Sequence, residues 1–241
     1  VMLKHFSVIF IISLFSVQQT TSEFIKAELD QKLIWLWCSS EKKNEIECIK
    51  SFGDAKEEWA IVKSTFQGWH YSAVDLQSFA NRIDELFNQI SSQLEHRKFS
   101  SVNTLTYQII FEFRLLRDCL LIDYYPLDGL IDLDISISEI ENTVQDQMFD
   151  LKYWFEFEDQ ICDFTEYLCY YKNYSTREIK IYFPSVNMED HNNLMESIQN
   201  CLERFQTSLS SGYRPDFIIP CNDLSLKVDE LILLFQSKEN I

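Results

Sequence analysis

Glycine and proline are scarce in this chain, with four of each among 241 residues. Tight turns depend on these two residue types, so a fold of many short strands, such as a sandwich or a barrel, is disfavoured. Hydrophobic residues make up 46% of the chain and aromatic residues 15%, which argues against intrinsic disorder and allows a sizeable core. The composition therefore favours a small number of long helices.

Motifs for catalysis and metal binding are also lacking. The sequence has no Cys-x-x-Cys pair, no Gly-x-Ser-x-Gly elbow and no papain-like cysteine context. A calcium loop through Asp128, Asp132 and Asp134 fails, because Gly129 does not stand at the sixth position of such a loop. We therefore predict a protein that is not an enzyme and has no metal or cofactor.

The histidines do not form a catalytic or metal-binding group in the sequence. Beyond the N-terminal segment they are His70, His96 and His191, and no two of them are close in sequence. None is spaced against a cysteine as zinc ligands are. We expect all three to lie at the surface.

The first 22 residues differ from the rest of the chain. Lys4 and His5 precede an apolar run over residues 6–15, and small polar residues follow. This order is typical of a secretory signal peptide, and a run of about ten apolar residues is shorter than the roughly 20 that a membrane-spanning helix needs. We expect residues 1–22 to be removed and residues 23–241 to form a secreted, extracellular domain that does not bind membranes.

Seven cysteines follow the leader, and secretion predicts that they form disulfide bonds. Three pairs would leave one thiol, which is either buried and free or bonded to a second chain. Cys38 and Cys48 suit a local pair, whereas Cys162 and Cys169 lie about 10.5 Å apart along one helix, beyond disulfide range. The candidates are Cys38, Cys48, Cys119, Cys162, Cys169, Cys201 and Cys221. Secretion also makes the sequon at Asn173 a glycosylation candidate.

Apolar residues recur at helical spacing along most of the chain. Helices are expected over 23–39, 54–66, 72–99, 102–125, 133–171, 188–210 and 223–236. The segment 133–171 is one long helix or two helices joined at a kink. Residues 178–183 alternate like a strand, but a lone strand is marginal, so we expect a loop or a short helix there. The pattern predicts an all-α, single-domain, disulfide-bonded bundle of six to seven helices.

Three features refine the expected helices. Ser72 is a good N-cap for the helix that follows it, with Asp75 three places later. Residues 102–125 are apolar on nearly all sides, which predicts the central, buried helix of the bundle. Pro126 is expected to end this helix, because proline cannot continue it.

Basic residues are nearly absent where acidic residues are densest. The chain has a net charge of −17, and residues 123–166 hold 13 acidic residues against Lys152 alone. A polyanion is not expected to bind nucleic acid. The acidic block is either a solvated helix face or a patch for a cationic partner, and interleaved aromatic residues fit a recognition surface. The candidate binding residues are Asp146, Asp150, Glu156, Glu158, Asp159 and Asp163.

The leader, the helical pattern, the absence of catalytic motifs and the run Glu166-Tyr-Leu-Cys-Tyr-Tyr-Lys-Asn-Tyr-Ser175 resemble small secreted helical proteins of insects, of the salivary and venom type. The resemblance implies binding of host or cuticular molecules. We predict a secreted binding protein whose acidic, aromatic-rich surface contacts an extracellular protein or another cationic macromolecule. The alternative is a carrier of a small apolar ligand in the helical core, which 19 phenylalanines and 11 tyrosines permit.

Overall fold

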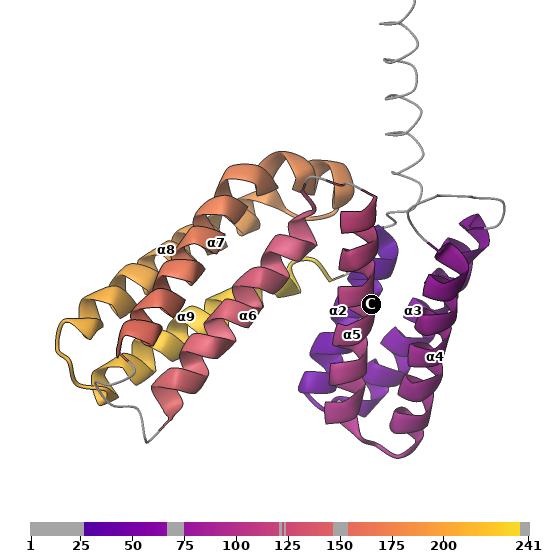
Figure 1. Cartoon of the computed structure of the whole chain (residues 1–241), viewed down its shortest axis with the longest axis horizontal. Coiled ribbons are helices and arrows are strands. Elements are labelled where there is room, and N and C mark those ends of the chain that lie inside the picture. The colour runs from indigo at the N-terminus through magenta and orange to yellow at the C-terminus, as the bar shows by residue number, and fades with distance from the viewer. Residues whose placement is uncertain (1–26, 67–74, 121, 123, 147–153, 237–241) are drawn as a thin grey trace, which may run out of the picture. The chain divides into compact units, whose positions relative to one another are not determined.

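The structure is a computed structural model that describes residues 27–66, 75–120, 122, 124–146 and 154–236. These ranges contain eight α-helices and no strand (Figure 1). The predicted all-α class is confirmed, whereas the predicted six to seven helices were too few. The expected leader over residues 1–22 lies outside the described residues.

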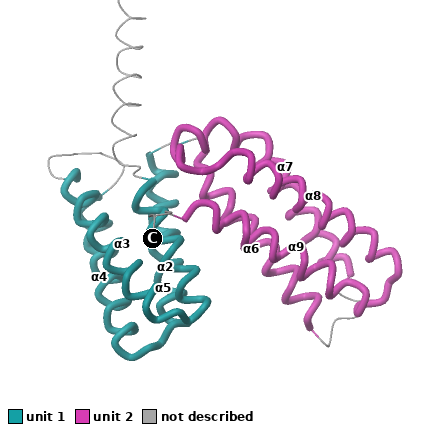
Figure 2. The backbone as a smooth tube through the Cα atoms, turned by 180° about the vertical axis from the view of Figure 1, so that it is seen from behind, with its two compact units in different colours: residues 1–122, 237–241 teal, residues 123–236 magenta. Residues whose placement is uncertain are grey.

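The helices form two compact units (Figure 2). The single domain predicted over residues 23–241 stays a prediction. The described part of unit 1 contains α2 (Ala27–Glu41), α3 (Glu45–Thr65), α4 (Leu76–Glu95) and α5 (Phe99–Cys119). Unit 2 contains α6 (Pro126–Gln145), α7 (Trp154–Tyr182), α8 (Met188–Leu209) and α9 (Pro215–Leu233). In each unit the first helix packs against the second and the fourth, and the third packs against the fourth. Each unit is therefore a four-helix bundle with the same order of helix pairing.

Polar caps and prolines set where several helices begin. Asp75 is the N-cap of α4 and accepts hydrogen bonds from the backbone N–H groups of Gln77 and Ser78. It takes the role predicted for Ser72, which lies outside the described residues. Pro126 begins α6 instead of ending a helix, because the first turn needs no backbone N–H from that residue. The segment 133–171, predicted as one long helix or two, contains the second part of α6, which ends before its C-cap Asp146, and the first part of α7.

Three other predicted boundaries were also wrong. Helix α7 runs to Tyr182 through the segment expected to be a loop or a short helix, because the fully buried Ile179 continues its core face. Helix α3 begins at Glu45 rather than at residue 54, with Asn44 as its N-cap. Helix α9 begins at Pro215 rather than at residue 223, and the fully buried Phe217 anchors its first turn.

Helix α5 is not the fully buried helix that the sequence predicted. Phe111 and Leu115 are 44% and 43% exposed, because each helix of a four-helix bundle keeps an outer face. On its inner face, Arg117 pairs with Asp30 of α2, with 3.5 Å between Nη1 and Oδ2 and both side chains buried. This ion pair ties the first and last helices of unit 1 together.

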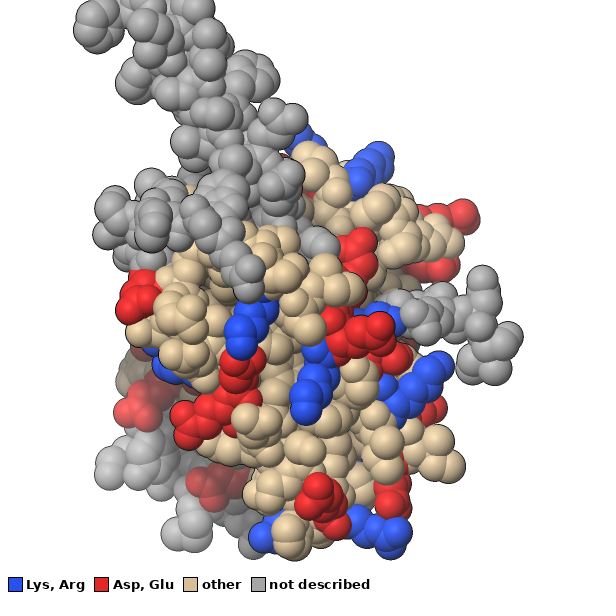
Figure 3. Space-filling view, turned by 90° about the vertical axis from the view of Figure 1, so that its right-hand side faces the viewer, with Lys and Arg blue, Asp and Glu red and all other residues tan. Residues whose placement is uncertain are grey.

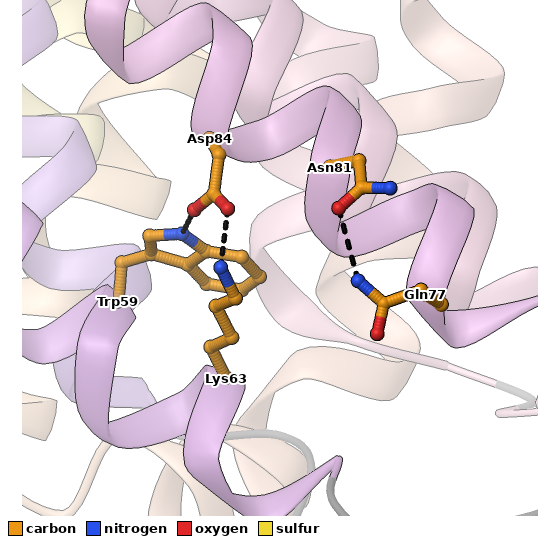
Figure 4. Close-up of polar contacts among 5 residues, drawn as sticks. All are labelled: Trp59, Lys63, Gln77, Asn81 and Asp84. Carbon is orange, nitrogen blue, oxygen red and sulfur yellow. Dashed lines mark hydrogen bonds and ion pairs between the residues drawn. The ribbon is translucent and has the colours of Figure 1, made fainter.

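Aromatic rings fill the core of unit 1, and one carboxylate satisfies the polar atom among them. Trp59 of α3 lies against four phenylalanine rings, those of Phe66, Phe79, Phe87 and Phe113. Its indole N–H donates to Asp84 Oδ1 of α4 at 2.8 Å, and Lys63 donates to the other carboxylate oxygen (Figure 4). Asp84 thus joins α3 to α4 at the edge of the core.

Acid should weaken unit 1 through Asp84. Burial raises its pKa, but the hydrogen bonds from Lys63 and Trp59 outweigh burial and hold the pKa below 3.8. The resulting stability is present above about pH 3.8 and is lost as the pH falls through the lowered pKa. We expect D84N to reduce the fall in urea midpoint between pH 5 and pH 2, with unfolding monitored by circular dichroism. At pH 7 the same substitution should lower the free energy of unfolding by about 1 kcal/mol. The exposed Asp118 provides a control, D118N, which should keep the wild-type profile.

Two helical glycines should respond to alanine with opposite signs. A Cβ at Gly53 of α3 meets nothing within 4 Å, so G53A should stabilise the protein by about 0.5–1 kcal/mol. A Cβ at Gly129 of α6 would lie 3.0 Å from Tyr171 Cδ2 and 3.2 Å from the Tyr124 hydroxyl. Tyr171 is fully buried and cannot retreat freely, so G129A should destabilise by about 1–2 kcal/mol in urea unfolding. An equal gain from both substitutions would contradict the close packing at Gly129.

Candidate functional site

Most of the predicted acidic binding residues lie together on α7. Glu156, Glu158, Asp159 and Asp163 are all exposed on this helix. Asp146 is the exposed C-cap residue of α6, and Asp150 lies outside the described residues. The structure thus gathers four of the six predicted positions on one element of unit 2.

One exposed flank of α7 carries a line of acidic and aromatic residues, which we name the α7 stripe. Its members are spaced three or four residues apart, so they follow one face of the helix. They are Glu156, Asp159, Asp163, Tyr167, Tyr170 and Tyr174, all of them exposed. The stripe covers about 27 Å of helix at 1.5 Å per residue. Acidic residues form its first half and tyrosines its second.

The core face of α7 explains why the stripe points outward. Phe157, Phe164, Leu168 and Tyr171 are buried at the same helical spacing. Because successive residues are rotated by about 100°, the members of the stripe lie together on one exposed flank of the helix, about 100° around it from these four. Glu158 lies on the other exposed flank of α7 and accepts a hydrogen bond of 2.7 Å from the Trp154 indole N–H.

The tyrosines at the end of the stripe form a cluster with Tyr124. The rings of Tyr170 and Tyr174 are 4.7 Å apart, and the Tyr124 ring lies 5.5 Å and 5.8 Å from them. Tyr170 and Tyr174 are still 48% and 51% exposed. A rigid aromatic cluster with this much open area suits contact with a partner, since tyrosine buries apolar surface at low entropic cost.

The charge of the stripe is of one sign. From Trp154 to Tyr171 helix α7 contains five acidic residues and no basic one. On the face of unit 1 in Figure 3, by contrast, Lys and Arg side chains are interspersed among Asp and Glu. The first half of the stripe therefore has no lysine or arginine of its own helix to neutralise it, and it presents a negative potential.

The predicted disulfides are absent: none of the seven cysteines, which all belong to the described residues, is bonded to another. Burial raises the pKa of Cys48 to about 11 and that of Cys221 to about 12, with neighbouring acids adding to both shifts. These buried thiols stay protonated and pack as small apolar side chains. Cys162 and Cys169 instead lie on the exposed side of α7. Cys38 and Cys201 are buried and Cys119 is exposed.

The glycosylation candidate Asn173 is exposed within α7, one residue before Tyr174 of the stripe. Its sequon partner Ser175 is fully buried. Glycosylation at Asn173 stays a prediction.

A second group of functional side chains was missed by the sequence. His191 of α8, expected at the surface, is only 1% exposed, and its Nε2 lies 3.2 Å from the Tyr171 hydroxyl. His191 Nδ1 and Ser175 Oγ are buried without a hydrogen-bond partner among the described residues. Helical spacing was the available signal, because His191 lies four residues before the buried Met195 and seven before Ile198.

Other kinds of site find little support in the described residues. These residues contain no group of three or more His, Cys, Asp or Glu side chains that could hold a metal ion. Within the same ranges, every helix is too short or too polar to cross a membrane. No protein-family model matches the chain, and no curated protein or solved structure is significantly similar to it. Function therefore has to be inferred from the geometry of α7 and its neighbours.

The buried His191 should make stability depend on pH near neutrality. Burial lowers its pKa below 6.5, although the side chain of Asn192 opposes the shift. The unfolded chain then binds the proton first, so stability falls as the pH drops from 6.5 toward the lowered pKa. We expect H191Q to reduce the change in urea midpoint between pH 7 and pH 5. The variant H96Q, at an exposed histidine, should show the same change in midpoint as the wild-type protein. A wild-type profile in H191Q would show that His191 titrates normally.

Proposed function

We propose that this chain is a secreted, non-enzymatic binding protein of the salivary or venom type, and that the α7 stripe binds a cationic segment of an extracellular macromolecule. The observation that supports this function best is the alignment of exposed acids and exposed tyrosines along one helix face. Scattered surface charges would favour no such partner.

The two halves of the stripe contribute differently to binding. Exposed ion pairs are worth only about 0.2–1 kcal/mol each, so Glu156, Asp159 and Asp163 mainly steer and orient the partner. Tyr167, Tyr170 and Tyr174 are 43%, 48% and 51% exposed, and the apolar area that they bury supplies most of the affinity. The matching partner carries Lys or Arg residues followed by apolar ones.

The alternative, a carrier of an apolar ligand, is favoured by no observation on the described residues. Three pockets that these residues line all include charged side chains, such as Arg82 and Glu112 between α4 and α5, or Asp190 and Glu230 between α8 and α9. Large aromatic side chains fill both cores, among them Phe87 in unit 1 and Phe205 in unit 2. An apolar ligand would have to displace such side chains.

The proposal predicts that binding to a cationic probe depends on where the acids lie and not only on their number. We would replace three stripe acids together (E156Q, D159N, D163N) and measure retention on immobilised poly-L-lysine in a salt gradient. The matched control replaces three exposed acids of unit 1, E41Q, E57Q and E95Q, none of which is in an ion pair within the described ranges. The stripe variant should lose roughly tenfold in affinity at low salt, and the control far less.

The tyrosine half is tested with a lysine–phenylalanine copolymer. The wild-type protein should prefer the copolymer to poly-L-lysine, and Y167S with Y170S should remove that preference while circular dichroism stays unchanged. If the stripe and control variants lose retention equally, overall charge is responsible and the stripe is not the binding site.

A further inference from the structure

A pocket lies between α7 and α8 of unit 2, separate from the α7 stripe. It has a volume of about 370 Å³, within the range of small-molecule sites. Its lining comes from both helices: Lys172, Ser175, Thr176, His191, Asn192, Met195, Glu196 and Gln199. The pocket is therefore contained within one compact unit.

Two buried polar atoms line this pocket without a partner. Ser175 is fully buried and His191 is 1% exposed. Neither Ser175 Oγ nor His191 Nδ1 has a hydrogen bond of normal geometry among the described residues, although Tyr171 lies near Ser175 and the side chain of Asn192 lies near His191. An unpaired buried polar atom costs about 1–3 kcal/mol, so two of them beside one cavity point to an occupant that hydrogen-bonds to both.

The contact with the Tyr171 phenol decides which nitrogen of His191 carries the proton. Burial raises the pKa of Tyr171 well above 10, so its hydroxyl keeps its proton. When that hydroxyl donates to His191 Nε2 at 3.2 Å, the proton of the neutral imidazole is on Nδ1. The Nδ1–H and the Ser175 hydroxyl then offer two donors from the floor of the pocket.

The rim carries one charge of each sign, from facing helices. Lys172 of α7 and Glu196 of α8 both line the pocket and both are exposed. Neither is in an ion pair with any described residue, so both charges are available to an occupant. Thr176, Asn192 and Gln199 add neutral hydrogen-bonding groups, and Met195 adds an apolar wall.

We propose that this pocket binds a small zwitterion, specifically a free α-amino acid. Its carboxylate accepts hydrogen bonds from His191 Nδ1 and Ser175 Oγ and pairs with Lys172, and its ammonium group pairs with Glu196. The side chain of the ligand packs against Met195. Two donors and a cation for one end, with a carboxylate for the other, match a zwitterion better than they match a ligand of single charge.

The experiment titrates the full chain with each of the common amino acids, using isothermal calorimetry and saturation-transfer NMR. For any amino acid that binds, the N-acetyl derivative lacks the ammonium charge and the amide lacks the carboxylate. Each derivative should bind at least tenfold more weakly than the parent. If no amino acid binds, or if a derivative binds as well as its parent, the proposal is wrong and ordered water fills the pocket.

Substitutions locate the binding. K172Q and E196Q alter exposed side chains and should each weaken binding about tenfold with unchanged circular dichroism. S175A should weaken it while removing one unpaired buried hydroxyl, so loss of folding does not explain its effect. The matched controls are K180Q of α7 and E189Q of α8, which lie outside the pocket lining. Equal losses in variants and controls would place any binding elsewhere.

Discussion

The packing of Tyr171 against Gly129 fixes the rotation of α7, and both proposed sites depend on that rotation. Tyr171 is fully buried, and its ring carbon Cδ2 lies 3.0 Å from the point where a Cβ of residue 129 would stand. Only glycine at that position of α6 allows the ring so close. With Tyr171 held inside the bundle, the residues of the α7 stripe lie to one side of this core face and are exposed.

The helical period then separates the two sites. Tyr174 and Ser175 are neighbours in sequence but are rotated by about 100° around α7, so one is exposed and the other buried. Tyr174 ends the α7 stripe, and Ser175 lines the pocket shared with α8. A large partner on the stripe and a small ligand in the pocket contact different side chains, so substitutions can separate the two activities.

The sequence predicted the helical class because apolar periodicity is a local property, and the structure confirmed it. The boundaries at Pro126 and Pro215 were misread because proline both ends and begins helices, and only the neighbouring packing decides which. The disulfides were predicted because the chain was expected to be secreted. That expectation carries no information on where the thiols lie in the fold. The acids of α7 were found from composition, but the Tyr171–His191 contact joins residues 20 positions apart and depends on how α7 and α8 pack.

The two bundles pair their helices in the same order but treat their buried polar atoms differently. In unit 1 the Trp59 indole N–H and the Asp84 carboxylate are matched, and Arg117 pairs with Asp30. Among the described residues, four buried side-chain atoms have no hydrogen-bond partner, and three of them are in unit 2: Tyr124 Oη, Ser175 Oγ and His191 Nδ1. The fourth, Asp54 Oδ2, lies 4.0 Å from Lys32 Nζ, so its charge is partly offset.

Because each unpaired buried atom costs about 1–3 kcal/mol, a bundle selected for stability alone would not concentrate such atoms around one helix. That concentration around α7 supports the proposal that binding takes place on unit 2.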